Sequence, residues 1–536
     1  MHAEATARDA QPLPTRRAEL LTRLGEARTW DIAVVGGGAT GLGVALDAAA
    51  RGFSVVLLES HDFAKGTSSR ATKLVHGGVR YLAQGDIGLV REALHERATL
   101  LRNAPHLAQP LAFVMPSYKF WETPFYGVGL KMYDALAGRA GLGATEFLSR
   151  NEVLGCLPAA RAEGLKGGVK YWDGQFDDAR LALARTAARE GALLVNYCGV
   201  TGLVHEGGKV AGLQCKDAET GREFTLRARC VVNAAGVWVD ALRAQDGEAT
   251  GRPVKPMVAP SQGVHVVVDR HFLDSDHALM VPKTADGRVL FGVPWLGKVI
   301  LGTTDTPRSD LPREPRPFRE ELDFILRESA HYLAKAPGVG DLRSIWVGLR
   351  PLVKPVGDAG EQTKGLSREH TVLVSRGSLV TVTGGKWTTY RAIAEDVLEK
   401  CFEAGLLARA AAGVTANLLL VGAGPAGGAR ANVAISAAPG AHLYGSEAAL
   451  LDGLPGARRQ LGGGLTEAMV RFAARNEYAR TAEDVLARRS RLLFLDARLA
   501  GALAAEVGAL LREENGVDPQ VEAFAQLARS YLELPA

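Results

Sequence analysis

The fold is decided by residues 30–59, WDIAVVGGGATGLGVALDAAARGFSVVLLE, which read as a strand, a glycine-rich turn, a helix and a second strand ending in an acid. Gly36, Gly38 and Gly41 have GxGxxG spacing, which lets backbone amides at a helix N-terminus approach a pyrophosphate. Glu59 is placed to accept ribose hydroxyls, and its carboxylate would repel a 2′-phosphate. The stretch predicts a dinucleotide-binding unit, and alone it does not separate NAD from FAD.

The composition predicts a soluble α/β protein of two or three domains. The chain has 536 residues, more than one hydrophobic core usually holds. Its net charge of +4 is too slight to argue for nucleic acid binding. The five cysteines show neither CxxC nor Cys/His metal spacing, so we expect no metal and a reducing cytoplasm. No apolar run approaches the ~18 residues of a spanning helix, so we expect any membrane contact to be peripheral.

The loop 61–86, which follows Glu59, is rich in glycine, hydroxyl groups and positive charge and holds few apolar residues. It predicts a ligand loop, although a solvated turn would have a similar composition. Its candidate groups are hydroxyl donors, a glycine that lets backbone approach a flat ring, a guanidinium and a phenol: Ser68, Ser69, Thr72, Gly77, Arg80 and Tyr81.

Later segments add further candidates. A strand of the same sheet is expected to end at Gly236, where backbone can again approach a ligand. Residues 251–348 have the pattern of antiparallel strands and predict a substrate domain. His265 alternates with two valines, and from its position a satisfied core histidine is the more frequent interpretation. Arg350 follows an apolar strand, and a second glycine turn enters a helix at Lys386, where helix amides suit an anion or a flavin carbonyl.

Two further stretches have more than one interpretation. Residues 119–137 combine aromatic residues with lysines at their edges, which suits a membrane interface, a substrate lid or buried packing. In the helical C-terminal part, Arg488, Arg489 and Arg491 are interpreted as a solvated face.

Five motifs resemble those of the aerobic FAD-dependent glycerol-3-phosphate dehydrogenases: GGGATG with Glu59, GTSSRATKLVHGGVRYL at 66–82, GTTD at 302–305, GLRP at 348–351 and GGKWTTYR at 384–391. The resemblance runs from Trp30 to the C-terminal helices and leaves the first 29 residues outside. It implies an α/β fold with a Rossmann-like FAD-binding domain, an antiparallel-sheet substrate domain that caps it, and a C-terminal helical domain.

The implied boundaries divide the chain into four parts. Residues 1–29 are an N-terminal extension, and 30–110 with 165–250 and 340–404 form a discontinuous FAD-binding domain. Residues 111–164 with 251–339 form the substrate domain, and 405–536 form the C-terminal domain.

The resemblance also implies an activity and a place in the cell. The activity is oxidation of sn-glycerol 3-phosphate to dihydroxyacetone phosphate by hydride transfer to FAD, with the electrons passed to a membrane quinone. The place is the cytoplasm, with peripheral attachment to the inner face of the cytoplasmic membrane. The partners are then glycerol 3-phosphate, the quinone and the membrane surface, while a homodimer stays open.

Residue roles follow by resemblance as well. His265 is the implied base, which reverses the interpretation from its position, and Arg350 stabilises the developing alkoxide. Arg80, Tyr81 and Lys386 suit a phosphate monoester and are implied around the substrate. The implied FAD contacts are Gly36, Gly38, Gly41, Glu59, Ser68, Ser69, Thr72, Lys73, His76, Gly77, Val200, Gly236, Gly385, Lys386 and Thr388.

The chain departs from the family pattern in two places, and three other functions stay open. Trp387 stands where the family often has leucine, and the loop 357–370 is not strongly basic. A glycerol-3-phosphate oxidase would share the pocket and use oxygen. An amine oxidase of the same flavoprotein class would use Arg350 to hold a carboxylate. A flavin-binding regulatory protein without turnover is disfavoured because Arg80, His265, Arg350 and Lys386 occur together.

Overall fold

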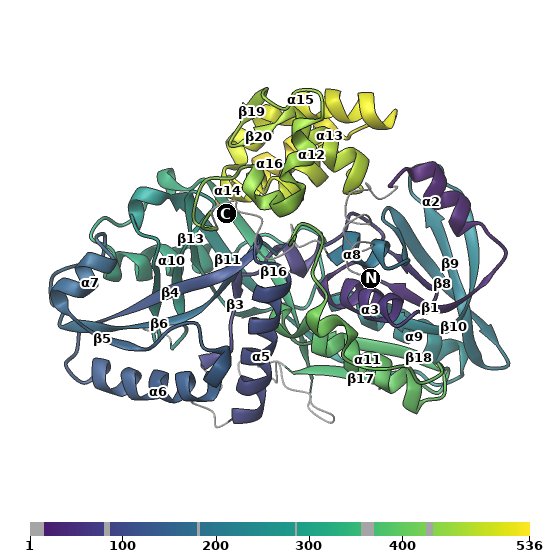
Figure 1. Cartoon of the computed structure of the whole chain (residues 1–536), viewed down its shortest axis with the longest axis horizontal. Helices are drawn as coiled ribbons and strands as arrows, with labels where there is room; N and C mark the ends of the chain where they lie inside the picture. Colours follow the sequence, from purple (N-terminus) through teal and green to yellow (C-terminus); the bar gives the residue numbers. More distant parts are fainter. Residues whose placement is uncertain are drawn as a thin grey trace.

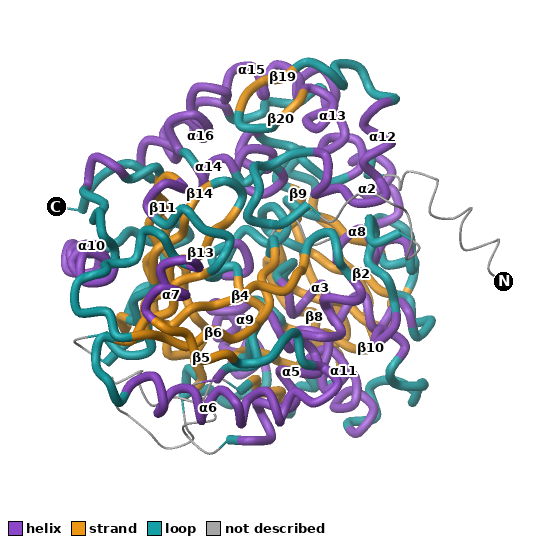
Figure 2. Tube along the Cα trace, turned by 60° about the vertical axis from the view of Figure 1, so that its left-hand side comes forward, coloured by secondary structure: helices purple, strands orange, loops and turns teal. Residues whose placement is uncertain are grey.

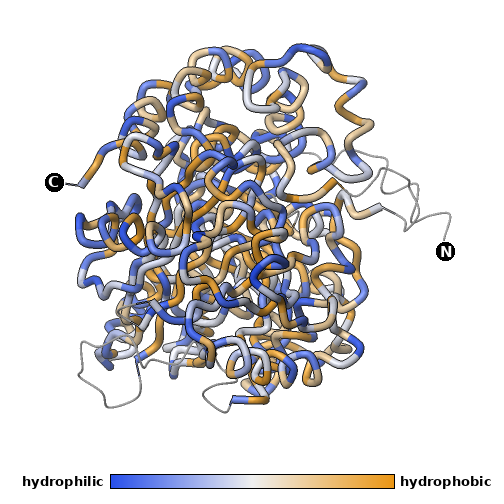
Figure 3. The backbone as a smooth tube through the Cα atoms, turned by 90° about the vertical axis from the view of Figure 1, so that its left-hand side faces the viewer, coloured by the Kyte–Doolittle hydropathy of each residue, from blue (hydrophilic) through white to orange (hydrophobic). Residues whose placement is uncertain are grey.

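Two large β-sheets lie side by side in the molecule, and a helical C-terminal domain covers one end of both (Figure 1). This computed structural model describes residues 15–79, 86–178, 183–284, 287–354, 369–424 and 433–535. Figure 2 shows the C-terminal helices α12, α13 and α15 at the top and helix α6 at the opposite end. Hydrophobic residues are distributed through both sheets and the C-terminal domain (Figure 3). Within the described ranges, every helix is too short or too polar to cross a membrane.

The first sheet is built around the strand–turn–helix–strand unit predicted from residues 30–59. Its order is β17-β18-β10-β1-β2-β7, and the β8–β9 hairpin joins through β10. The central strands are parallel and buried on both faces, which explains the continuous apolar run of β1. The strands are β1 (Thr29–Val35), β2 (Val55–Leu58), β7 (Leu193–Val195), β8 (Cys198–Glu206), β9 (Lys209–Asp217), β10 (Glu223–Asn233), β17 (His370–Val374) and β18 (Leu379–Gly384).

Helix α3 (Ala39–Ala50) packs tightly on this sheet because its side chains are small. A Cβ on Gly43 would lie 2.9 Å from the ring of Tyr390, so the glycine lets α3 approach helix α11. The helices of this layer are α3, α8 (Leu183–Arg189), α9 (Val239–Ala249) and α11 (Tyr390–Glu403).

The second sheet is mainly antiparallel, as predicted for the substrate domain. Its order is β15-β11-β14-β13-β12-β4-β6-β3, with β16 on β11 and β5 on β6. The strands are β3 (Leu74–Val75), β4 (Ala108–Ser117), β5 (Glu146–Ser149), β6 (Gly167–Phe176), β11 (Val258–Asp269), β12 (Ala278–Val281), β13 (Leu290–Trp295), β14 (Lys298–Gly302), β15 (Thr306–Pro307) and β16 (Ser344–Val353). The helices that accompany it are α5 (Ile87–Asn103), α6 (Glu122–Ala137), α7 (Arg150–Cys156) and α10 (Arg319–Tyr332).

The pairing of these strands corrects the predicted domain boundaries. Strand β6 was placed with 165–250 in the cofactor domain, but it pairs along its whole length with β4 in the second sheet. Strand β16 was placed with 340–404, but it pairs with β11 over ten residues, from Val258↔Val353 to Val267↔Ser344. Both segments are largely buried strands, and only hydrogen bonding decides which sheet such a strand joins.

The described part of the N-terminal segment is packed into the protein, which corrects its interpretation as an extension. Helix α2 (Arg17–Leu24) buries Leu20, Leu21 and Leu24. Arg17 is buried as well, and its guanidinium pairs with Asp217 and donates to the backbone carbonyl of Tyr197. From residue 15 onward the segment is therefore part of the cofactor domain.

The C-terminal domain is mainly helical, as expected, and it is anchored by buried arginines. Its elements are α12 (Ala448–Asp452), β19 (Gln460–Gly462), β20 (Leu465–Thr466), α13 (Glu467–Asn476), a π-helical turn at Asp484–Arg489, α14 (Leu492–Leu495), α15 (Ala497–Asn515) and α16 (Val521–Ser530).

The prediction of a solvated arginine face in this domain is wrong. Arg488 and Arg489 both pair with Asp62 in the loop after β2, and Arg491 pairs with Asp178 after β6. All three side chains are buried or nearly so because their carboxylate partners lie on the other domains.

Candidate active site

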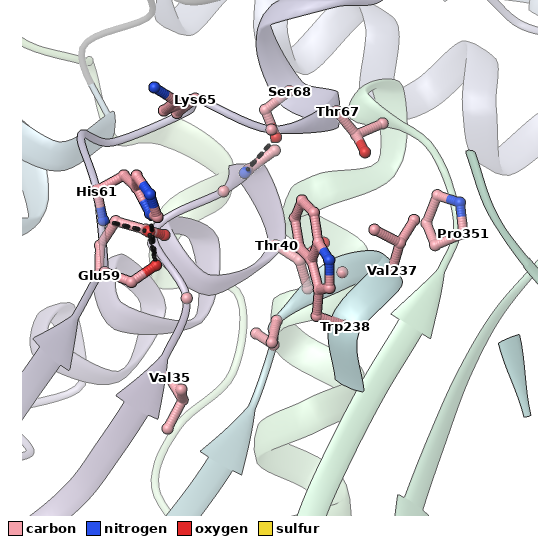
Figure 4. A pocket seen from close by; sticks show the side chains of 18 of the residues that line it. Val35, Thr40, Glu59, His61, Lys65, Thr67, Ser68, Val237, Trp238 and Pro351 are labelled. Carbon is pink, nitrogen blue, oxygen red and sulfur yellow. Dashed lines mark hydrogen bonds between the residues drawn. The ribbon is translucent and has the colours of Figure 1, made fainter. Parts of the chain in front are cut away.

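A pocket opens at the carboxyl ends of β1, β2 and β10, the edge at which parallel α/β sheets bind ligands. Figure 4 shows Glu59 and His61 on one side, Thr67 and Pro351 on the other, and the indole of Trp238 between them. The predicted cofactor residues that line it are Gly36, Gly38, Glu59, Ser68, Val200, Gly236, Gly385 and Lys386.

The glycine turn at the pocket floor is required by close backbone contacts. A Cβ on Gly41 would overlap the carbonyl oxygen of Gly36, so the first turn of α3 packs directly on the end of β1. Gly36 itself has a φ of 104°, which side-chain-bearing residues rarely adopt. The exposed end of α3 therefore presents its amides to the pocket, where they suit a pyrophosphate. Gly41 does not line the pocket, but its close contact with Gly36 supports this geometry.

Glu59 directly follows β2, and its carboxylate contacts the glycine turn. One oxygen accepts the backbone N–H of Gly37 at 2.7 Å, and the other accepts the N–H of His61 at 2.9 Å. Ser68 closes the turn from the opposite side, where its hydroxyl oxygen accepts the N–H of Ala39 at 2.9 Å (Figure 4). These contacts hold the Glu59 carboxylate, the predicted ribose acceptor, and the Ser68 hydroxyl on opposite sides of the glycine turn.

The rim of the pocket includes residues that the sequence analysis did not single out. Arg313 stacks over the ring of Trp238 at 4.1 Å, and the indole N–H donates to the carbonyl of Leu311 at 3.2 Å. Lys65 pairs with Glu483 of the C-terminal domain at 2.7 Å. Burial and then Lys65 and Arg313 lower the pKa of His61, so this imidazole is neutral at neutral pH. No local motif marks this rim, because it joins three domains.

His265 belongs to a second cluster of residues. Its side chain lies on the face of β11 opposite the side chains of Val264 and Val266. Its Nε2 is 2.9 Å from the hydroxyl of Thr72, and its ring stacks on Trp346 with centroids 4.2 Å apart. The Nδ1 atom has no hydrogen-bond partner among the described residues. Burial, then Arg350 and Lys73, hold the pKa of His265 well below 6.5. A neutral imidazole with one nitrogen unpaired is suited to accept a proton.

Arg350 lies on the neighbouring strand β16, on the same sheet face. Its Nη2 donates to the carbonyl of Thr304 at 2.9 Å and to the hydroxyl of Thr303 at 3.2 Å, and its Nη1 is 3.6 Å from Asp305. A Cβ on Gly263 would overlap this guanidinium, and one on Gly302 would lie 2.7 Å from the ring of His265. Two glycines of the sheet thus make room for the two predicted catalytic side chains. Pro351, the next residue, lines the pocket.

The second glycine turn brings the C-terminal end of the first sheet to the pocket. Gly384 and Gly385 have φ values of 82° and 74°, and Lys386 precedes the short helix Trp387–Thr389. The indole N–H of Trp387 donates to the carbonyl of Ser68 at 2.8 Å, so the residue that departs from the family pattern joins the two predicted ligand loops. Lys386 lines the pocket beside Trp387.

Other predicted cofactor residues hold the loop and do not line the pocket. The hydroxyl of Thr388 accepts the backbone N–H of His76 at 3.2 Å. The N–H of Gly77 donates to the hydroxyl of Tyr133 at 2.9 Å, and a Cβ there would overlap that hydroxyl. The hydroxyl of Ser69 donates to the carbonyl of Ala64 at 2.6 Å, and Lys73 is fully buried.

Arg80 and Tyr81 lie outside the described residues, as does most of the loop 357–370. Within the described ranges, no group of three or more His, Cys, Asp or Glu side chains could hold a metal ion.

Comparison with known proteins gives consistent matches over nearly the whole chain. The family model of the FAD dependent oxidoreductases matches residues 31–391, and that of the C-terminal domain of alpha-glycerophosphate oxidase matches residues 414–522. The mitochondrial glycerol-3-phosphate dehydrogenase of Bos taurus is 41% identical over 97% of this chain and 75% of its own length. A probable mitochondrial glycerol-3-phosphate dehydrogenase of Caenorhabditis elegans is 40% identical over 99% of this chain and 77% of its own, so the similarity extends into residues 1–29.

A solved structure is similar over its full length. The glycerol-3-phosphate dehydrogenase from Bacillus halodurans, complexed with FAD, has a TM-score of 0.74 and 28% identity, covering 97% of this chain and 98% of that chain.

Proposed function

Because the chain belongs to the family of FAD-dependent glycerol-3-phosphate dehydrogenases, we propose that it oxidises sn-glycerol 3-phosphate to dihydroxyacetone phosphate with FAD and passes the electrons to a membrane quinone. The observation that carries the catalytic part is the convergence of Thr72, His265 and Arg350 from three distant segments, with Pro351, the residue after Arg350, lining the pocket.

The residues that line the pocket carry chemical groups that suit FAD. The amides at the N-terminus of α3, above the glycine contact of Gly36 and Gly41, suit the pyrophosphate. The carboxylate of Glu59 suits the ribose of the adenosine half. The loop at Ser68 and the turn at Gly385 line the pocket as well, and their hydroxyl and backbone groups would suit the polar edge of a flavin ring.

Different residues are proposed to serve different parts of the reaction. Bound FAD supplies the acceptor for the hydride from C2 of the substrate. The imidazole of His265 takes the proton of the C2 hydroxyl. Its Nδ1 accepts this proton in the tautomer in which Nε2–H donates to the hydroxyl of Thr72. The guanidinium of Arg350 stabilises the negative charge that develops on the C2 oxygen. Lys386, together with Arg80 and Tyr81, provides donors for the phosphate.

The choice of electron acceptor can be tested directly. After anaerobic reduction of the bound flavin by glycerol 3-phosphate, a soluble ubiquinone analogue is expected to reoxidise it much faster than oxygen does. Stopped-flow absorbance of the flavin measures both rates. Fast reoxidation by oxygen with formation of peroxide would overturn the quinone assignment and support an oxidase.

The same experiment tests the amine oxidase alternative when glycine or sarcosine replaces glycerol 3-phosphate as the substrate. Glycine and sarcosine are expected to leave the flavin oxidised. Bleaching by either of them, without bleaching by glycerol 3-phosphate, would contradict the proposed substrate.

A peripheral membrane attachment is proposed for one face of α6, at the inner face of the cytoplasmic membrane. Helix α6 lies at the end of the molecule opposite the C-terminal domain (Figure 2). Large apolar side chains on α6 and beside it are more than two-fifths exposed: Phe120, Trp121, Phe125, Val128, Met132 and Phe147. Lys119 and Lys131 lie 5.9 and 5.0 Å from the rings of Trp121 and Phe147. Apolar side chains edged by lysines suit an anionic lipid surface.

The double substitution Phe125→Ser/Met132→Ser is expected to weaken binding to phosphatidylglycerol vesicles at least tenfold, since burying each large apolar side chain contributes about 1.5–3 kcal/mol. Cosedimentation of the FAD-loaded protein measures the bound fraction. Val339→Ser removes an apolar side chain that is 52% exposed outside this surface and is the matched control. Equal binding of the double variant and the control would refute the docking surface.

A further inference from the structure

Four charged side chains are buried together, and one of them, Lys73, has its Nζ 4.9 Å from the Trp346 ring on which His265 stacks. They are Lys73 from the loop after β2, Asp177 and Asp178 from the end of β6, and Arg491 from the C-terminal domain, and each is at most 1% exposed. Phe494, three residues after Arg491, packs edge-on against Trp346 with centroids 5.3 Å apart. The C-terminal domain therefore contributes both a charge and a ring beneath the proposed base.

Arg491 and Lys73 hold the same point of the ligand loop. The Nη2 of Arg491 donates to the carbonyl of Ser69 at 3.0 Å and to Asp178 at 2.9 Å. The Nζ of Lys73 donates to the same carbonyl at 2.6 Å and to both oxygens of Asp178, at 2.7 and 2.9 Å. Two donors, one from the C-terminal domain and one from the loop itself, thus hold the Ser69 carbonyl and close residues 69–73 into a fixed turn.

This turn carries the hydroxyl that contacts His265. Thr72 lies directly before Lys73, and its Oγ1 is 2.9 Å from the Nε2 of His265. Lys73 has a φ of 64°, a backbone conformation that side-chain-bearing residues rarely adopt, so the direction of Thr72 depends on how Lys73 is held. A displacement of Ser69 or Lys73 would move Thr72 away from the imidazole.

Stability alone does not explain these buried charges. Removing charges from water is costly, and well-packed apolar side chains of similar volume are often as stable or more stable. Burial, and next the charge of Arg491, lower the pKa of Lys73 to about 7, so Lys73 is only partly protonated near neutral pH. Arg491 is then the permanently charged donor to Ser69.

We propose that Arg491 of the C-terminal domain is a positioning residue for His265, acting through the Ser69 carbonyl and the Thr72 hydroxyl. The inference rests on the proposed role of His265 as the base. It makes the C-terminal domain part of the catalytic apparatus, although none of its described residues lines the cofactor pocket.

The test is a double-mutant cycle on the FAD-loaded full chain. The limiting rate of anaerobic flavin reduction by glycerol 3-phosphate, per bound FAD, is measured for Arg491→Gln, Thr72→Val and the combination of both. Each single change is expected to lower the limiting rate about 10- to 100-fold. The double variant is expected to be no slower than the slower single variant, because both substitutions remove the same set of contacts that positions His265. The substrate concentration at half-saturation is expected to stay the same.

Matched variants keep the test decisive. Arg489→Gln removes a neighbouring buried arginine that pairs with Asp62 and not with the Ser69 turn. It is expected to lower thermal stability but not the limiting rate. Thr72→Ser, which keeps the hydroxyl, is expected to restore the rate. If Arg491→Gln does not fold, Arg491→Lys replaces it, since it keeps the charge without the forked donors.

Multiplicative losses in the double variant, or equal rates in Arg491→Gln and Arg489→Gln, would overturn the positioning role. A parallel His265→Gln measurement separates this failure from failure of the base. If the His265→Gln variant reduces flavin at the wild-type rate, the assignment of His265 as the base is wrong. If that variant is slow while the losses of Arg491→Gln and Thr72→Val multiply in the double variant, only the role of Arg491 is wrong.

Discussion

His265→Gln is expected to slow reduction of bound FAD by glycerol 3-phosphate by about 10²- to 10⁴-fold, the usual contribution of a general base. Glutamine has a similar shape but cannot take up the hydroxyl proton. The variant is expected to keep its FAD, because His265 does not line the cofactor pocket. Anaerobic stopped-flow measurement of flavin bleaching, with the flavin content of the purified protein, gives both quantities.

The pH dependence of the wild-type protein adds a second check on the base. Burial holds the pKa of His265 well below 6.5, so the ring stays neutral and able to accept a proton as the pH falls to about 6.5. Protonation, and loss of rate, are expected only at lower pH. His205→Gln is the matched control, because this histidine of β8 pairs with Asp246 of α9 and lies on the first sheet, whereas His265 lies on the second. A His265→Gln variant as fast as the control would refute the base role.

Arg350→Gln is expected to lower the limiting rate of flavin reduction by about 10²- to 10³-fold, the loss seen when one donor to a developing oxyanion is removed. The guanidinium lies on the sheet face of His265, held by Thr303, Thr304 and Asp305, so its charge is already oriented before the substrate binds. Glutamine removes that charge. The limiting rate and the substrate concentration at half-saturation are measured together by stopped flow.

Two further variants sharpen this prediction. Gly263→Ala leaves Arg350 unchanged but places a Cβ where the guanidinium lies, so it is expected to lower the same limiting rate. Arg308→Gln, a half-buried arginine whose guanidinium pairs with Asp310 and donates to Gln262, is expected to keep it. A rise in the half-saturating concentration of Arg350→Gln with an unchanged limiting rate would mean that Arg350 holds the phosphate and does not assist the chemistry.

Much of the cofactor pocket could be predicted from local sequence. The glycines of residues 30–59 are required by contacts within the same unit, such as Gly41 against Gly36, and the acid follows its strand directly. The alternation of His265 with Val264 and Val266 also placed it correctly on the opposite sheet face, because strand geometry has a period of two. It did not indicate whether that face was core or site, since this depends on Thr72 and Arg350 from other segments.

The predicted cofactor list could not distinguish lining from supporting residues. Gly77 and Lys73 belong to the right loop, but their polar groups contact Tyr133 and Asp178. A motif marks a whole loop, while the direction of each side chain depends on the tertiary partner it meets. The same reason explains the misplaced strands β6 and β16, whose apolar pattern fits either sheet.

The sequence by itself determined the dinucleotide unit, the antiparallel character of the second sheet and the family, because these depend on spacing between near neighbours in the chain. Only the tertiary structure decided that Arg488 and Arg491 are buried and Arg489 nearly so, and that Arg491 reaches the turn that holds Thr72. The sequence alone shows where an arginine, and therefore a positive charge, occurs in the chain. Its burial depends on carboxylates hundreds of residues away, and Asp62 and Asp178 become partners only when the three domains pack together.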